Sequence, residues 1–143
     1  MNYLSKYLIE EAAAITSSAQ NLDDREVSKA LELLDCCSKN NLKLIVSGVG
    51  KSGIVARKIA ATFSSVGSPS FFVHPGEANH GDLGMIKKGD STILISNSGE
   101  TSELTNIIIH CKKSKIPIIS RNVAGGPVRK SGAKFEDFQI LQK

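Results

Sequence analysis

Four short apolar runs, separated by helix-like segments, most constrain the fold of this chain. The runs are rich in β-branched residues and occupy residues 42–46, 70–73, 92–95 and 116–119. Because each run is almost continuously apolar, we expect both faces of the corresponding strand to be buried. Two intervening segments, residues 52–65 and 103–113, repeat apolar residues three or four positions apart. This alternation predicts an α/β fold in which helices cover both faces of a parallel sheet.

The first 39 residues predict two helices that precede this core. Residues 3–18 and 23–38 each show an apolar stripe, and Asn21 is a candidate N-cap for the second helix. A weaker run at Phe135–Leu141, interrupted by two acidic residues, is a candidate fifth strand. We expect a single domain over residues 1–143, with N-terminal helices at 1–39 and the core at 40–143.

The composition limits the kinds of partner and compartment. The chain of 143 residues carries 18 Lys and Arg against 14 Asp and Glu, a net charge of +4, without a long basic block. With two tyrosines and no tryptophan to stack on bases, nucleic-acid binding is disfavoured, and a local site for a small anion such as phosphate is favoured. No apolar run approaches the roughly 18 residues of a membrane span, and the first residues lack a signal-peptide pattern. Since the three cysteines form no disulfide or metal motif, we expect a cytoplasmic protein without membrane association.

The first motif with chemical content is Ser47-Gly48-Val49-Gly50-Lys51-Ser52-Gly53, between a predicted strand and a predicted helix. Glycines allow close backbone approach to a ligand, and the N–H groups of a helix start attract anions. The GxGxxG spacing matches a dinucleotide fingerprint, but the next strand ends at His74 instead of an acidic ribose partner. A Walker A loop would need glycine in place of Ile45. A tight turn without ligand is the structural alternative, but Lys51 and two hydroxyls favour an anion site.

The second motif is Ser96-Asn97-Ser98-Gly99-Glu100-Thr101-Ser102-Glu103, again between a strand and a helix. Its hydroxyl and N–H groups could surround a phosphate, although Ser, Thr and Glu are also typical of helix capping. Because ligands of open α/β sheets bind at the carboxyl edge of the strands, both loops are predicted to converge on one site.

The third motif, His74-Pro75-Gly76-Glu77-Ala78-Asn79-His80-Gly81-Asp82, follows the second predicted strand and reaches the same edge. Its histidines and carboxylates could hold a metal or move protons, but the spacing matches no structural zinc site. His110 is interpreted as a boundary residue on a helix. The cysteines Cys36, Cys37 and Cys111 are interpreted as core residues.

Taken together, these motifs resemble the sugar isomerase (SIS) domain of D-arabinose 5-phosphate isomerases. The resemblance covers about residues 40–122 and rests on four runs, at 48–53, 57–63, 67–84 and 96–100. It implies a three-layer αβα sandwich around a five-stranded parallel sheet, of the flavodoxin or Rossmann-like kind, in a homotetramer. It also implies interconversion of D-arabinose 5-phosphate and D-ribulose 5-phosphate, the entry to the Kdo sugar of lipopolysaccharide.

The resemblance also assigns residues to the site. The positions of Lys51 and Glu103 are catalytically relevant in the family, and His74 stands where an inhibitory zinc can bind. The predicted substrate-binding residues combine the glycine loop, the serine loop and positions that line the family's site: Ser47, Gly48, Ser52, Gly67, Ser68, His80, Ser96, Asn97, Ser98, Thr101 and Asn106.

Aldose–ketose isomerisation moves a proton between adjacent carbons through a cis-enediol. It needs a base, an acid for the carbonyl oxygen and positive charge for the enediolate, and no cofactor. We assign Glu103 as the base, Lys51 as electrostatic stabiliser and His80 to the oxygen-bound protons.

The chain departs from the family at its carboxyl end. The family continues with a further glutamate, a histidine and a Thr/Ser-rich segment, and many members carry two CBS modules, whereas this chain ends at Lys143. A truncated enzyme with impaired activity is therefore one expectation. The alternative is a non-catalytic or degenerate module that binds sugar phosphates. A dinucleotide-dependent oxidoreductase is a third hypothesis, which lacks an acidic ribose partner.

Overall fold

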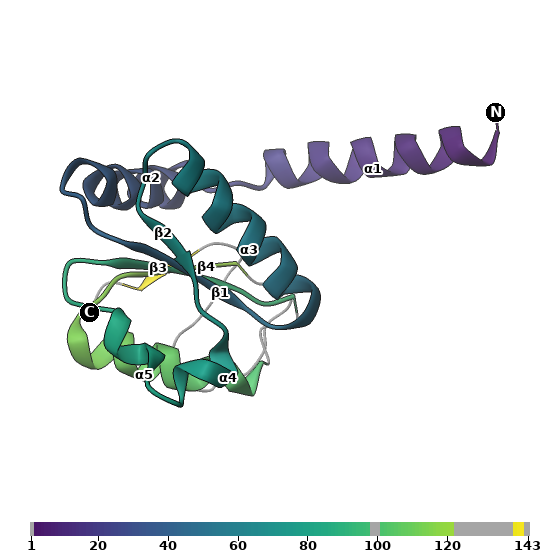
Figure 1. The fold of residues 1–143 in the computed structure, drawn as a ribbon. Helices are drawn as coiled ribbons and strands as arrows, with labels where there is room; N and C mark the ends of the chain where they lie inside the picture. Colours follow the sequence, from purple (N-terminus) through teal and green to yellow (C-terminus); the bar gives the residue numbers. More distant parts are fainter. Residues whose placement is uncertain (1, 98–100, 122–138, 142–143) are drawn as a thin grey trace.

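The computed structural model describes residues 2–97, 101–121 and 139–141 of the chain. Two helices come first, and strands alternate with helices thereafter (Figure 1). The elements are α1 (Tyr3–Gln20), α2 (Asp24–Lys39), β1 (Leu44–Gly48), α3 (Gly50–Ser65), β2 (Ser70–Phe72), α4 (Pro75–Ala78), the 3₁₀ turn η1 (Asp82–Met85), β3 (Ser91–Ile95), the 3₁₀ turn η2 (Ser102–Leu104), α5 (Thr105–Ser114), β4 (Ile118–Arg121) and β5 (Gln139–Leu141).

One sheet holds the five described strands in the order β2-β1-β3-β4-β5. The first four strands in this order are parallel, as the apolar runs predicted. The expectation of a five-stranded parallel sheet is wrong in its last strand, because β5 pairs with β4 in the antiparallel direction. A parallel strand requires a crossover, usually a helix, but residues 122–134 contain three glycines and a proline and show no apolar stripe. Antiparallel edge strands on parallel sheets are common.

The sheet separates two apolar cores, which explains why its strands are apolar on both faces. On one face, Leu44 and Val46 pack with Ala56 and Ala60 of α3. On the other face, Ile45 belongs to a core with the described residues Val73, Ala78, Ile86, Leu94, Leu104, Ile107, Ile108, Cys111, Ile116 and Ile118. In Figure 1, α3 accordingly lies on the opposite side of the sheet from α4 and α5. Each fully buried isoleucine or leucine contributes about 1.5–3 kcal/mol through removal from water.

The two N-terminal helices differ in how they relate to this body. Helix α2 buries Ala30 and Cys37, whereas no residue of α1 is buried despite its predicted apolar stripe. The prediction that Asn21 caps α2 is wrong: Asp23 accepts hydrogen bonds from the amides of Arg25 (2.8 Å) and Glu26 (3.3 Å). Asn21 instead terminates α1. A carboxylate is as good an N-cap as an amide and also favours the positive end of the helix.

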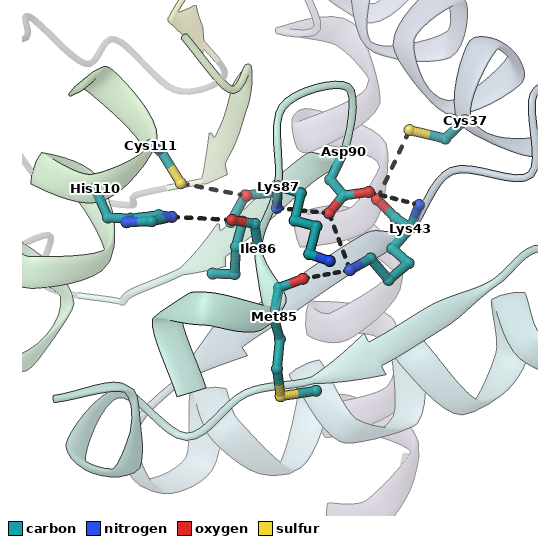
Figure 2. Close-up of polar contacts among 9 residues, drawn as sticks. Cys37, Lys43, Met85, Ile86, Lys87, Asp90, His110 and Cys111 are labelled. Atoms are coloured by element: carbon teal, nitrogen blue, oxygen red, sulfur yellow. Dashed lines mark hydrogen bonds and ion pairs between the residues drawn. The ribbon is translucent and has the colours of Figure 1, made fainter. Parts of the chain in front are cut away.

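A buried polar cluster ties the amino ends of β1 and β3 together (Figure 2). The carboxylate of Asp90, 3% exposed, accepts hydrogen bonds from the amides of Lys43 (3.0 Å) and Lys87 (2.8 Å). The ammonium of Lys43 lies 3.3 Å from the same carboxylate and also donates to the carbonyl of Met85. Because the buried Asp90 carboxylate depends on these donors for its hydrogen bonds and counter-charge, this cluster fixes the spacing of the two strands.

The cysteines and His110 surround this amino end. The Cys37 thiol donates to the Ser91 hydroxyl (3.2 Å), and burial raises the pKa of Cys37. Burial also raises the pKa of Cys111, whose sulfur lies 3.5 Å from the Thr92 hydroxyl. The prediction that all three cysteines are core residues is wrong for Cys36, which is exposed. His110 is half-buried, as expected for a boundary residue, with Nε2 3.0 Å from the Ile86 carbonyl.

Candidate functional site

The candidate site lies at the opposite end of the sheet, where β1 and β3 end side by side. Gly48, the last residue of β1, is in register with Ile95, the last residue of β3. The connection from β1 leads through α3 to β2 on one side, and the connection from β3 leads through α5 to β4 on the other. In open α/β sheets, such a divergence of crossovers marks the place where ligands bind. The glycine loop and the serine loop therefore flank one position, as predicted.

The glycine loop approaches its neighbours too closely for side chains. A Cβ atom at Gly48 would lie 2.9 Å from the carbonyl carbon of Ser52 and 3.0 Å from the carbonyl oxygen of Ile95. A Cβ atom at Gly53 would lie 2.7 Å from the carbonyl oxygen of Gly48. Gly50 has a φ of +58°, which favours glycine. These glycines bring the start of α3 against the end of β1.

The first turn of α3, at this end of the sheet, contains several polar groups. Its N-cap residue, Val49, provides no side-chain hydrogen bond to the first turn. Lys51 is exposed and forms no ion pair with any residue that the structure describes, while Ser52 is half-buried. Uncapped amides, an ammonium and a hydroxyl in one turn form a favourable environment for a phosphate or an enediolate.

Ser47 is placed differently from the other polar residues of this loop. It is fully buried in β1, and its hydroxyl donates a 2.6 Å hydrogen bond to the carbonyl of Val73. This bond attaches the end of β1 to the residue that precedes His74. The structure thus gives Ser47 an internal partner, and its predicted contact with substrate stays a prediction.

The serine loop combines a buried anchor with exposed polar groups. The Ser96 hydroxyl is buried and lies 2.9 Å from the hydroxyl of Thr101, so the two ends of the loop are joined. Asn97 is exposed, and the predicted residue Ser98 lies outside the described residues. Glu103 is exposed, and its carboxylate accepts a 3.2 Å hydrogen bond from the Ser102 hydroxyl. Buried Leu104 anchors this turn, which leaves the Glu103 carboxylate accessible to a ligand.

The histidine loop begins with a side chain that caps a short helix. The Nδ1 atom of His74 accepts a 3.1 Å hydrogen bond from the amide of Gly76 at the start of α4. The neutral ring therefore carries its proton on Nε2, as inferred from this bond. A metal at Nε2 would require the proton to move to Nδ1 and would break the cap. Among the described residues, no group of three or more His, Cys, Asp or Glu side chains could hold a metal ion.

One hydrogen bond connects the histidine loop with α5. The Nδ2 atom of Asn106 donates to Oδ1 of Asn79 at 2.6 Å, and Asn79 precedes the exposed His80. Asn106 stands three residues after Glu103. The Asn79–Asn106 hydrogen bond therefore fixes the distance between the histidine loop and the start of α5, next to the predicted proton-transfer groups His80 and Glu103. The third motif included Asn79, but no sequence pattern indicated its bond to Asn106, because the two asparagines are 27 residues apart and meet only in the folded chain.

Two predicted site residues lie elsewhere in this chain. Gly67 and Ser68 follow α3 and precede β2, at the amino end of the sheet and away from the three loops. Gly67 has a φ of +88°, and the amide of Ser68 donates to the carbonyl of Phe63, which is the arrangement of a helix C-cap. Their predicted contact with substrate stays a prediction.

Comparison with known proteins agrees with this arrangement. The sequence profile of the SIS domain matches residues 38–121. The chain belongs to the SIS domain family. It is 60% identical to the arabinose 5-phosphate isomerase KdsD of Escherichia coli strain CFT073, over 71% of this chain and 30% of that protein. It is 48% identical to the KdsD of Francisella tularensis, over 71% of this chain and 31% of that protein. The chain thus spans about a third of the length of these curated relatives.

Solved structures show the same fold. A sugar-phosphate isomerase described as putative, from Listeria monocytogenes, matches with a TM-score of 0.80 at 30% identity, covering 100% of this chain and 76% of that chain. A protein of Escherichia coli strain CFT073, solved in complex with arabinose 5-phosphate, matches with a TM-score of 0.67 at 42% identity, covering 85% of this chain and 66% of that chain. The resemblance inferred from the motifs is therefore confirmed at the level of the SIS domain and its relation to arabinose 5-phosphate isomerases. In addition, none of the helices described here has the length and apolar character needed to span a membrane.

Proposed function

We propose that this SIS domain binds a phosphorylated pentose and interconverts D-arabinose 5-phosphate and D-ribulose 5-phosphate. The observation that carries the proposal is the convergence of the glycine loop and the serine loop at the adjacent ends of β1 and β3. Their N–H and hydroxyl groups match the phosphate, and Lys51 and Glu103 add the charges that the chemistry needs. The relatives named arabinose 5-phosphate isomerases, and the relative solved with arabinose 5-phosphate bound, support this choice of substrate. The product would feed Kdo synthesis in the cytoplasm.

The reaction requires two proton movements on carbon and two on oxygen. In the direction of the ketose, the Glu103 carboxylate removes the proton from C2 of arabinose 5-phosphate while O1 gains a proton, which forms the cis-enediol. The same carboxyl group then returns a proton to C1, and O2 loses its proton as the ketone forms. Lys51 stabilises the negative charge on the enediolate oxygens, and His80 transfers the protons between O1 and O2. No cofactor enters this scheme, and a zinc ion at His74 would act as an inhibitor.

The test compares turnover of the purified chain with that of two matched variants. Formation of ribulose 5-phosphate from arabinose 5-phosphate can be followed by NMR, without coupling enzymes. Since a positioned general base contributes about 10²–10⁴-fold, Glu103→Gln is expected to lower kcat at least a hundredfold. The control Glu32→Gln, an exposed carboxylate on α2, is expected to leave kcat unchanged. Undiminished turnover in Glu103→Gln would remove the assignment of the base.

A non-catalytic module that binds sugar phosphates is the second candidate function, because the converging glycine loop and serine loop support phosphate binding and do not by themselves require turnover. Both functions require binding, so arabinose 5-phosphate is expected to raise the melting temperature of the chain in either case. Stabilisation without turnover at high protein concentration would favour the module. Neither stabilisation nor turnover would contradict both candidates.

A further inference from the structure

The side chain of Arg57, on α3, places its charge over an aromatic ring of the edge strand. Its guanidinium carbon lies 4.0 Å from the centre of the Phe72 ring, which is a cation–π contact. Arg57 is exposed and forms no ion pair with any residue that the structure describes. Phe72 is half-buried at the end of β2, where it packs against the core that α3 covers. The contact therefore joins α3 to the edge of the sheet.

The Phe72 ring also contacts the candidate site on two sides. A Cβ atom at Gly53 would lie 3.8 Å from Cζ of this ring, so the tip of the ring reaches the glycine loop. The ring of His74 lies next to it in a T-shaped arrangement, with the ring centres 6.4 Å apart and the planes at 66°. Aromatic rings attract each other at this separation and angle. The position of the Phe72 ring thus affects what supports His74.

His74 needs this support because it holds the start of a very short helix. Helix α4 has four residues, and a helix of one turn has little stability of its own. Its first turn is held by the 3.1 Å hydrogen bond from the Gly76 amide to Nδ1 of His74. Its C-cap, Asn79, accepts the 2.6 Å hydrogen bond from Asn106. The orientation of the His74 ring therefore affects a helix whose other end is bonded to α5, beside the predicted proton-transfer groups.

The chain runs from β2 directly into α4 (Figure 1), so the contacts form one continuous series. A cation over an exposed aromatic face stabilises that arrangement enough to favour it about two- to fivefold. The neighbouring Lys58 is also exposed, but it makes no such contact with a ring of any described residue. The effect on the ring thus belongs to position 57 and not to the charge of α3 in general.

We propose that Arg57 is a positioning residue of the candidate site. Its guanidinium holds the Phe72 ring against His74, and this ring keeps Nδ1 of His74 in place as the acceptor of the Gly76 amide. The histidine loop is thereby held in its position beside the glycine loop. The effect of Arg57 on turnover rests on the proposed function, whereas its effect on the His74 hydrogen bond does not.

Hydrogen exchange of the Gly76 amide, measured by NMR on the whole chain, reports how often the His74 cap opens. Arg57→Met keeps an unbranched apolar side chain and removes the charge, and it is expected to raise the exchange rate about two- to fivefold. Arg57→Lys keeps a cation and is expected to stay within a factor of about two of the unmodified chain. The matched control Lys58→Met removes the adjacent charge and is expected to leave the rate unchanged.

A second background separates the ring from the rest of α3. Phe72→Leu removes the ring, so adding Arg57→Met to it is expected to cause no further change in Gly76 exchange. In the isomerase assay, Arg57→Met is expected to lower kcat about two- to fivefold and leave KM unchanged, because Arg57 acts on the position of the histidine loop and not on the phosphate. Because Arg57 is exposed, circular dichroism should show its variants folded.

Several results would overturn the proposal. Unchanged Gly76 exchange in Arg57→Met would exclude Arg57 from the support of His74, whether or not the chain is catalytic. An equal rise in Lys58→Met or Arg57→Lys would show that the cation over Phe72 is not what acts. A further rise when Arg57→Met is added to Phe72→Leu would contradict a route through the ring. A higher KM with unchanged kcat would assign Arg57 to phosphate binding instead. Absence of turnover in the unmodified chain would contradict the proposed function, while Gly76 exchange would still decide the role of Arg57.

Discussion

Replacement of Asp90 offers the sharpest test of what holds the sheet together. In Asp90→Ala, the amides of Lys43 and Lys87 lose their acceptor, and the Lys43 ammonium loses its counter-charge. A hydrogen bond to a charged group contributes about 1.5–3 kcal/mol, and breaking a buried ion pair costs about 3–5 kcal/mol. Because water reaches the exposed Lys87 and part of Lys43, we expect the lower end, a loss of about 3 kcal/mol in the free energy of unfolding. For a domain of this size, that corresponds to a fall of about 9 °C in Tm.

Urea denaturation followed by circular dichroism measures this loss. The matched control is Asp35→Ala, which removes an ion pair to Lys39 of 2.6 Å on the surface of α2, where the Asp35 side chain is 58% exposed. Exposed pairs contribute little, so this variant is expected to lose less than about 0.5 kcal/mol. Asp90→Asn keeps one acceptor oxygen and should fall between the two. Equal losses in Asp90→Ala and Asp35→Ala would refute the reasoning that burial of the carboxylate makes this cluster important.

Three further predictions concern the two ends of the sheet. Gly53→Ala should lower the free energy of unfolding by at least about 2 kcal/mol and abolish sugar-phosphate binding, because its Cβ would lie 2.7 Å from a backbone carbonyl oxygen. In the control Gly84→Ala, the Cβ meets no atom within 4 Å, so calorimetry and ligand-induced thermal shifts should show stability and binding unchanged. Asn79→Ala and Asn106→Ala should each lower kcat more than they raise KM. Because both changes break the same hydrogen bond, the double variant should lose no more kcat than the worse single variant, and additive losses would contradict this coupling. Burial raises the pKa of Cys111, so the neutral thiol stabilises the folded state; this contribution is complete below pH ~8.5 and is lost as the pH rises through the raised pKa. Between about pH 8 and about pH 10, the urea midpoint should therefore fall further in the unmodified chain than in Cys111→Ala.

The sequence predicted the parallel strands because a strand with both faces buried needs apolar residues at successive positions, as in β1. Leu44 and Ile45 face opposite cores, so an apolar residue is required at both positions and the run is visible without a structure. The orientation of β5 was not predicted correctly, because a short strand pairs in either direction and only its connection decides. Helix α4 was missed, since Pro75 and Gly76 are typical of loops, although proline also favours the first turn of a helix.

The candidate site was predictable where close backbone approach demands a particular residue. Gly48 and Gly53 are such positions, and the prediction of an anion site rested on this glycine loop together with Lys51 and two hydroxyls. The bond from Ser47 to the Val73 carbonyl and the bond between the two asparagines depend on segments that only the fold brings together. Polar residues with such tertiary partners look like surface residues in a sequence. The same holds for Asp90, which no motif singled out.

The shortness of β2 has a consequence for the order in which the molecule opens. β2 holds only three residues and occupies the edge of the sheet, whereas β1 and β3 have neighbours on both sides. Its ends are held by the bond from the Leu44 amide to the Pro69 carbonyl, and by the Val73 amide bonded to the Val46 carbonyl. Local opening of this edge therefore costs less free energy than opening of the central strands, and the amides of β2 exchange with solvent before those of β1 and β3. Since the segment leading to His74 and His80 continues directly from β2, the histidine loop belongs to the part of the fold that a bound ligand can stiffen most.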